Sequence, residues 1–176
     1  NKRIFAIGDA AGRMQFTHVA GYHAGIVIRN ILFRLPAKID DGAVPWCTYT
    51  DPELAHVGMT LKAASDQGIT AKEVEFALDG NDRARAELRT EGKVVAVVDG
   101  KGQILGASIL APQAGEMIQP WVLAISKKMK IGAMASYIAP YPTYGEASKR
   151  AAGAYFTPSL FSERTAKIVR FLLRLP

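Results

Sequence analysis

The chain has 176 residues, of which 49% are hydrophobic and 22% are charged. This composition is typical of a globular protein with one ordinary domain and part of a second, and it excludes an intrinsically disordered chain. The formal net charge of +6 would suit nucleic acid or an anionic membrane. The basic residues are scattered except near the C-terminus, so we do not expect nucleic acid as a partner.

Cysteine and histidine usage narrows the chemistry further. Cys47 is the single cysteine, which excludes an internal disulfide and fits a reducing compartment, so we expect a cytoplasmic protein. His18, His23 and His56 lack the spacing of metal ligands, so no metal site is predicted. No apolar run approaches the roughly 20 residues that span a bilayer.

The first 40 residues predict one strand and one helix. Ile4–Ile7 is a short apolar run that reads as a buried strand, and Gly8-Asp9 ends it in a tight turn. Thr17 is the predicted N-cap of a helix that runs to about Phe33. Because the chain begins directly on a buried strand, we expect it to be part of a longer protein.

Residues 36–45 read as a linker, because they hold two prolines, a glycine and a pair of aspartates. We therefore predict a first unit at 1–40 and a second at 43–176. In the second unit, Asp99-Gly100-Lys101-Gly102 is a strong hairpin signal. Strands are predicted at 44–49, 72–78, 93–99 and 103–110, and helices at 60–67, 114–128, 145–155 and 159–175. Without regular βαβ alternation, this order predicts an α+β domain with a central antiparallel sheet flanked by helices.

Two separated segments resemble the pyridine nucleotide–disulfide oxidoreductase class, which includes dihydrolipoamide dehydrogenase and mercuric reductase. The first runs from Ile4 through Gly8-Asp9 to Phe16-Thr17-His18 and resembles the final FAD-contacting motif of that class. The resemblance implies cofactor binding by Gly8, Asp9, Phe16, Thr17 and His18. Glycine permits close backbone approach, Asp9 can bond a ribityl hydroxyl, and the helix start aims N–H groups at the flavin.

The second segment, Ala139–Glu146, resembles the stretch that carries the general base. Dihydrolipoamide dehydrogenase-like enzymes have a histidine there, with a glutamate five residues later that orients it. Here Tyr141 replaces the histidine and Glu146 keeps the glutamate position. Mercuric reductases also have a tyrosine there, but they end in a vicinal cysteine pair that this chain lacks.

The resemblance covers essentially the whole chain, since Thr50–Gly58 and Ile104–Ile118 also match the family pattern. It implies the end of an FAD domain followed by an interface domain that forms a homodimer. The sequence has no Gly-x-Gly-x-x-Gly and no Cys-x4-Cys. The resemblance therefore places FAD, NAD(P)H and the redox disulfide with other segments of a longer parent protein, and the isolated chain is expected to bind no cofactor.

The implied catalytic residues have alternative readings. A phenol titrates near pH 10, so Tyr141 cannot simply replace imidazole as a base. It either donates a proton or hydrogen bond, helps hold a soft metal, or packs across the dimer interface. Glu146 either bonds Tyr141 or is only a first-turn acid that favours the helix dipole.

Two further alternatives concern the C-terminal helix and the activity. Four basic residues recur at helical spacing opposite an apolar stripe, namely Arg164, Lys167, Arg170 and Arg174. This pattern predicts a helix docked on its own domain. The less favoured alternative is peripheral contact with an anionic membrane. The parent protein is expected to be an enzyme that passes electrons between NAD(P)H, FAD and a thiol, disulfide or metal-ion substrate. The alternative is a catalytically inert homodimerisation module.

Overall fold

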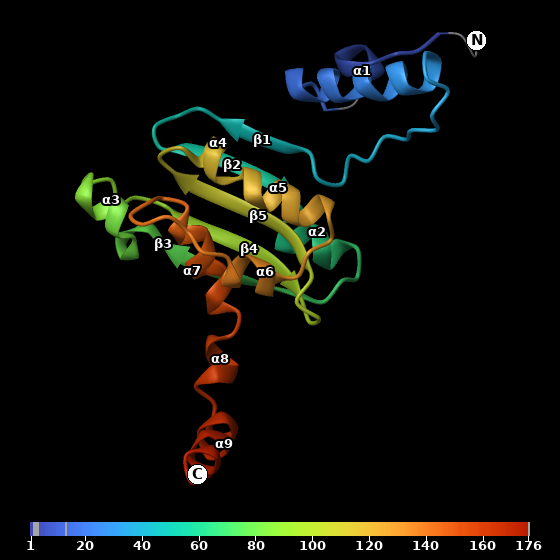
Figure 1. Cartoon of the computed structure of the whole chain (residues 1–176). Coiled ribbons are helices and arrows are strands. Elements are labelled where there is room, and N and C mark those ends of the chain that lie inside the picture. Colours follow the sequence, from blue (N-terminus) through green and yellow to red (C-terminus); the bar gives the residue numbers. More distant parts are fainter. Residues whose placement is uncertain (2–3, 13, 176) are drawn as a thin grey trace.

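The computed structural model describes residues 1, 4–12 and 14–175. Figure 1 shows an N-terminal helix that lies beside a sheet domain, and a C-terminal helical segment that extends from the opposite side of that domain.

The N-terminal part differs from the sequence prediction. The buried strand predicted at Ile4–Ile7 is wrong, because these residues form no strand and Ile4 is 74% exposed. A strand needs a neighbour for its N–H and C=O groups, and no described strand pairs with this segment. A short 3-10 helix, η1 (Gly8–Ala11), comes next and leads to α1 (Thr17–Ile31). Thr17 is the first residue of α1 and Phe16 is its N-cap, so the predicted Thr17 cap is also wrong.

A five-stranded antiparallel sheet forms the centre of the molecule. Its strands stand in the order β1-β2-β5-β4-β3, which confirms the predicted α+β class. The strands are β1 (Pro45–Thr48), β2 (Glu53–Gly58), β3 (Ala71–Ala77), β4 (Lys93–Asp99) and β5 (Ile104–Ala111).

The β4–β5 hairpin forms as its turn residues predict. The Asp99 carboxylate accepts hydrogen bonds from the backbone N–H groups of Lys101 and Gln103, both at 2.8 Å. Gly102 adopts a φ of 81°, which a glycine reaches without steric cost. The turn therefore brings β5 back alongside β4 as its antiparallel partner.

Helices cover one face of the sheet, as Figure 1 shows for α4, α5, α6 and α7. The single helix predicted at 114–128 is divided, and Pro120 stands in the first turn of its second part. The helices of the sheet domain are α2 (Leu61–Asp66), α3 (Asp82–Ala86), α4 (Ala114–Met117), α5 (Gln119–Ser126), α6 (Ile131–Ser136) and α7 (Glu146–Ala154), with a 3-10 turn η2 at Leu78–Gly80.

Trp121 of α5 lies at the centre of the core between the sheet and the helix layer. Its side chain is fully buried, and its indole N–H donates to the Ser148 hydroxyl of α7 at 3.0 Å. Apolar residues from the covered face of the sheet complete this core, including Ala55, Val57, Val94, Ala96, Val98 and Ile109. Trp121 therefore joins α5 to α7 inside one chain and is not part of an exposed helix face.

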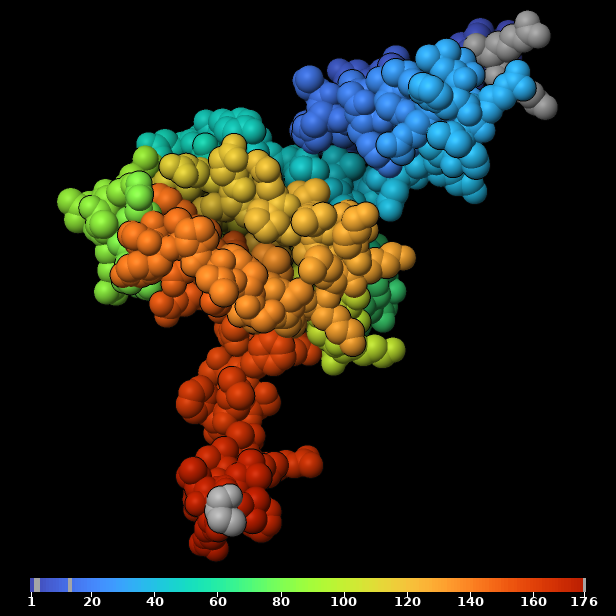
Figure 2. All heavy atoms as spheres, viewed as in Figure 1, coloured from blue at the N-terminus to red at the C-terminus, as the bar shows by residue number. Residues whose placement is uncertain are grey.

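The C-terminal segment consists of α8 (Thr157–Leu160) and α9 (Glu163–Leu172). Figure 2 shows it projecting from the body of the molecule. Within the described residues α9 has no extensive contact with the sheet domain, and Phe171 and Leu172 are 63% and 55% exposed. The expectation that this helix docks on its own domain is therefore wrong.

The position of Trp121 predicts a large stability effect. Trp121→Ala should lower the free energy of unfolding by about 3–5 kcal/mol, because it leaves a cavity and removes the donor to Ser148. Urea unfolding followed by far-UV circular dichroism measures this change. Leu173→Ala is the matched control, since Leu173 is 80% exposed and its truncation should stay within about 0.5 kcal/mol. Equal unfolding midpoints for the two variants would contradict the placement of Trp121 in the core.

Candidate functional site

Residues 140–145 form a loop between α6 and α7 that contains the predicted catalytic tyrosine. Asn81 is 3% exposed and holds this loop, because its side-chain amide donates to the Thr143 carbonyl at 3.0 Å. The Asn81 side-chain oxygen also accepts from the Ala84 N–H at 3.0 Å and caps α3. One buried side chain therefore fixes the loop relative to α3.

Two tyrosine side chains make hydrogen bonds that hold the same loop. Tyr144 is 4% exposed and donates from its hydroxyl to the Glu87 carboxylate at 2.8 Å. Burial, followed by that hydrogen bond, raises the pKa of Tyr144, while the same hydrogen bond lowers the pKa of Glu87. Tyr137 donates to the Gly145 carbonyl at 3.0 Å. Both contacts hold the C-terminal end of the loop, at Tyr144 and Gly145.

Tyr141 lies at the exposed tip of this loop, with 69% of its surface accessible. Its hydroxyl donates to the Asp82 carboxylate in the first turn of α3 at 2.9 Å. This hydrogen bond and the negative charge of Asp82 raise the pKa of Tyr141 above that of a free phenol. The phenol therefore stays neutral at physiological pH and donates its proton in the hydrogen bond to Asp82.

Glu146 is the first residue of α7 and its side chain is only 17% exposed. Its carboxylate lies 3.5 Å from the Arg150 guanidinium, one turn further along α7. Burial, followed by the charge of Glu146, raises the pKa of Tyr137. Glu146 thus stands where a first-turn acid favours the helix dipole. It forms an ion pair with Arg150, whereas the Tyr141 hydroxyl bonds Asp82.

The predicted cofactor residues lie at the corner where η1 meets α1. Gly8 has a φ of 55°, and a Cβ on it would lie 2.7 Å from the Ala20 Cβ, so only glycine fits there. Its N–H donates to Nδ1 of the buried His23 at 3.1 Å. Asp9 follows in the exposed turn, and no side chain caps the first turn of α1.

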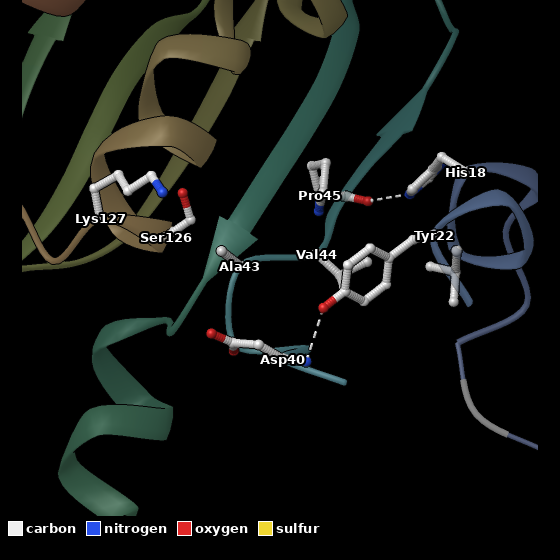
Figure 3. Close-up of a pocket in the computed structure, with 9 residues that line it drawn as sticks. His18, Tyr22, Asp40, Ala43, Val44, Pro45, Ser126 and Lys127 are labelled. Atoms are coloured by element: carbon white, nitrogen blue, oxygen red, sulfur yellow. Dashed lines mark hydrogen bonds between the residues drawn. The ribbon is translucent and has the colours of Figure 1, made fainter. Parts of the chain in front are cut away.

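Aromatic rings mark the start of α1. The Phe16 and His18 rings stack with centroids 5.2 Å apart. Nε2 of His18 lies 2.8 Å from the Pro45 carbonyl oxygen, and the Tyr22 hydroxyl accepts from the Asp40 N–H at 2.9 Å. Figure 3 shows both contacts reaching from α1 to the linker and β1.

A cleft of about 380 Å³ lies between α1 and the sheet domain, lined by His18, Tyr22, Asp40, Ala43, Ser126 and Lys127 among others. Polar side chains face it from α1, from the linker and from the end of α5 (Figure 3). The cleft follows from the way His18 and Tyr22 hold α1 beside the linker.

The structure thus places the predicted residues in two groups, one at η1–α1 and the other at the 140–145 loop and the start of α7, in separate parts of the molecule (Figure 1). Sequence reasoning missed Asn81 and Asp82, although Asn81 before a short helical run is an N-cap signal. It also missed the role of His23 beneath Gly8. Asp82 and Asn81 lie 59 and 62 residues before the loop residues that they bond, and His23 lies 15 residues after Gly8. No local sequence pattern links residues so far apart.

Other chemistry-bearing residues are structural. Cys47 is half-buried in β1, and burial, followed by the charge of Glu53, raises the pKa of its thiol. His56 contacts the Ser108 hydroxyl and the Gly58 carbonyl. Among the described residues no group of histidine, cysteine and acidic side chains could hold a metal ion, and no helix there has both the length and the apolarity to cross a membrane.

Comparison with known proteins gives concordant matches. The family described as "Pyridine nucleotide-disulphide oxidoreductase, dimerisation domain" matches residues 44–152. A mercuric reductase of Staphylococcus aureus is 37% identical over 153 residues, which is 86% of this chain and 28% of that protein. A dihydrolipoyl dehydrogenase of Bacillus subtilis is 33% identical over 144 residues, which is 81% of this chain and 31% of that protein.

Solved structures agree with this fold. The HOCl-induced flavoprotein disulfide reductase RclA from Escherichia coli superimposes with a TM-score of 0.80 at 29% identity, over 85% of this chain and 35% of RclA. LpdA from Mycobacterium tuberculosis gives a TM-score of 0.79 at 26% identity, over 85% of this chain and 33% of LpdA. The chain spans about a quarter to a third of the length of the curated relatives it matches. Its sheet domain, from residue 44 to residue 152, belongs to the dimerisation domain family of the pyridine nucleotide-disulphide oxidoreductases.

Proposed function

We propose that this chain is the C-terminal portion of an FAD-dependent pyridine nucleotide–disulfide oxidoreductase. In this proposal residues 1–40 are the end of the FAD domain and residues 43–176 are the interface domain. The observation that carries it is the pairing of the family's dimerisation fold with a rigidly held loop that presents Tyr141 to solvent. The parent protein would pass electrons between NAD(P)H, FAD and a disulfide or metal-ion substrate.

The residues at the N-terminal corner fit a flavin. FAD supplies the redox chemistry when it is bound, and this chain would supply part of its cradle. Gly8 lets η1 pack against Ala20 of α1, and Asp9 beside it presents an exposed carboxylate that could accept from a ribityl hydroxyl. The uncapped first turn of α1 at Phe16, Thr17 and His18 directs amide dipoles outward, which suits an anionic group.

The loop residues suit the delivery of a hydrogen bond or a proton. Tyr141 is exposed and its hydroxyl is oriented by Asp82, so we assign Tyr141 the role of donor to substrate and Glu146 that of a charge at the start of α7. The relatives divide on the substrate, since some are named mercuric reductases and others dihydrolipoyl dehydrogenases. A Cu(II) complex of RclA is also among the matched structures. We favour a metal-ion or disulfide substrate over dihydrolipoamide.

An inert dimerisation module remains the alternative for the isolated chain.

We propose that the sheet domain forms a homodimer through the exposed side of α5, where Leu123 is 57% exposed. Trp121, being buried, cannot contribute to that interface. The cofactor-binding contacts of residues 8–18 alone are too few to offset the entropy that FAD loses on binding.

The proposed homodimer is testable in solution. The chain should sediment as a dimer at micromolar concentration, since an obligate interface buries more than about 2,000 Å². Leu123→Glu should shift it toward monomer, whereas Lys62→Glu should not, because Lys62 lies on α2 with its side chain 83% exposed. Analytical ultracentrifugation makes the measurement, and a monomeric wild-type chain would refute the proposed dimer.

The link between Tyr141 and Asp82 predicts a titration effect. Asp82→Asn removes the negative charge that disfavours the phenolate, so the pKa of Tyr141 should fall. Asp66→Asn removes an acid from α2 and should leave the titration of Tyr141 unchanged. NMR of Cζ-labelled tyrosine, assigned with Tyr141→Phe, measures both variants. An unchanged Tyr141 titration in Asp82→Asn would mean that the hydrogen bond does not form in solution.

The catalytic proposal is tested in the parent protein. Oxidation of dihydrolipoamide needs a base for the thiol proton, and loss of a well-placed base costs about 10² to 10⁴ in rate. The Tyr141 protein should therefore be a weak dihydrolipoamide dehydrogenase, and Tyr141→His should raise this rate if Glu146 orients the new ring. The assay is dihydrolipoamide-dependent NAD⁺ reduction by the flavin-loaded dimer.

Two outcomes would count against these assignments. A wild-type rate typical of dihydrolipoyl dehydrogenases would remove the reason for favouring a metal-ion or disulfide substrate. If Tyr141→Phe leaves every tested reductase activity unchanged, Tyr141 has only a packing role.

A further inference from the structure

The C-terminal helix α9 is strongly amphipathic. At 100° per residue, Arg164, Lys167 and Arg170 fall on one side of the α9 axis, with Phe171 among them. The opposite side is apolar and carries Ile168, Val169 and Leu172, followed by Leu173 at the C-cap. Four basic residues and one acidic residue lie after residue 156, so the segment carries a local excess of positive charge. Such a combination is complementary to a surface that is both apolar and anionic.

No other part of the described chain covers this apolar side. Ile168 and Val169 are 49% and 46% exposed, and Leu173 is 80% exposed. Phe161, at the junction of α8 and α9, adds a further ring that is 85% exposed. Figure 2 shows the segment standing away from the sheet domain, so its apolar side is accessible to a large planar partner.

The junction between α8 and α9 is polar and well defined. The Ser162 side chain caps α9 by accepting from the Thr165 N–H at 3.2 Å, and its hydroxyl lies 2.9 Å from the Ser159 carbonyl oxygen. The Thr165 hydroxyl also donates to the Ser159 carbonyl at 2.7 Å. These bonds define the start of α9, and all of them come from the C-terminal segment itself.

We propose that α9 binds the surface of an anionic lipid bilayer and lies in the plane of its interface. The apolar side would enter the acyl boundary, while the lysine and arginine side chains reach the headgroups. Ten residues span about 15 Å, half of the roughly 30 Å hydrocarbon core, so α9 cannot cross the membrane.

A second copy of α9 fits this surface less well. Two helices of ten residues are too short to bury the roughly 1,200 Å² of a specific stable interface. Anionic headgroups instead complement Lys167 and Arg170, and each basic residue adds about fivefold to the affinity for such a surface. The inference is independent of the proposed redox function.

Co-sedimentation of the 176-residue chain with lipid vesicles tests the proposal. The chain should pellet with phosphatidylcholine vesicles that contain about one third phosphatidylglycerol, and far less with pure phosphatidylcholine. Lys167→Gln with Arg170→Gln should weaken the partition coefficient on the order of 30-fold, and high salt should weaken it in the wild type. Ile168→Ser with Leu172→Ser should abolish binding, because the apolar insertion is lost.

Matched controls change the same chemistry elsewhere. Lys62→Gln with Lys101→Gln removes two exposed charges, and Leu88→Ser with Ile138→Ser removes two side chains that are 91% and 94% exposed. Both should bind as the wild type does. The proposal is overturned if the wild type ignores anionic vesicles, if Ile168→Ser with Leu172→Ser still binds, or if the α9 changes alter only the oligomeric state measured by ultracentrifugation.

Discussion

The candidate catalytic loop depends on one buried amide. Asn81 donates to the Thr143 carbonyl and accepts from the Ala84 N–H, so the same side chain terminates the loop and starts α3. Asp82, which orients the Tyr141 hydroxyl, is the residue directly after Asn81. Asn81 therefore positions both Asp82 and the loop that carries Tyr141. A primary amide is the side chain that can do both, since it carries a donor and an acceptor a fixed distance apart. The geometry of the Tyr141–Asp82 pair therefore depends on the hydrogen bonds of the buried Asn81 amide as well as on the bond between Tyr141 and Asp82.

Local patterns in the sequence predicted most of the sheet. The Asp99–Gly102 turn and the apolar strands beside it carry their signals within a few residues, and they formed as predicted. Strand β2 was missed because Glu53 and His56 interrupt its apolar alternation. Glu53 lies on the helix-covered face and accepts from the Gly115 N–H, whereas His56 lies on the opposite face of the sheet. The strand predicted at Ile4–Ile7 failed for the converse reason, since its composition is that of a strand but no described strand pairs with it.

The site itself was only half predictable. Tyr141, Glu146, Gly8 and Asp9 are visible as residues in a familiar spacing, but the groups that set their properties come from distant parts of the chain. Asp82 and His23 belong to no recognisable sequence motif. Only the folded chain brings Asp82 to Tyr141 and His23 to Gly8. The exposed apolar side of α9 was equally hidden, because an amphipathic pattern is the same whether the helix docks on its own domain or on something else.

The strand order has a consequence for how this domain is synthesised. β5 is the last strand in the chain, yet it occupies the middle of the sheet and joins the β1–β2 pair to the β3–β4 pair. During translation, β2 and β4 emerge with one open edge each and cannot close the sheet until residue 111 has left the ribosome. Open strand edges template pairing between chains. Neighbouring nascent chains on one message are therefore exposed to each other's strand edges from the synthesis of Gly58 to that of Ala111, which is about half of the 44–152 domain. A ribosome that stalls before β5 would leave the β1–β2 and β3–β4 pairs as separate hairpins with unpaired edges.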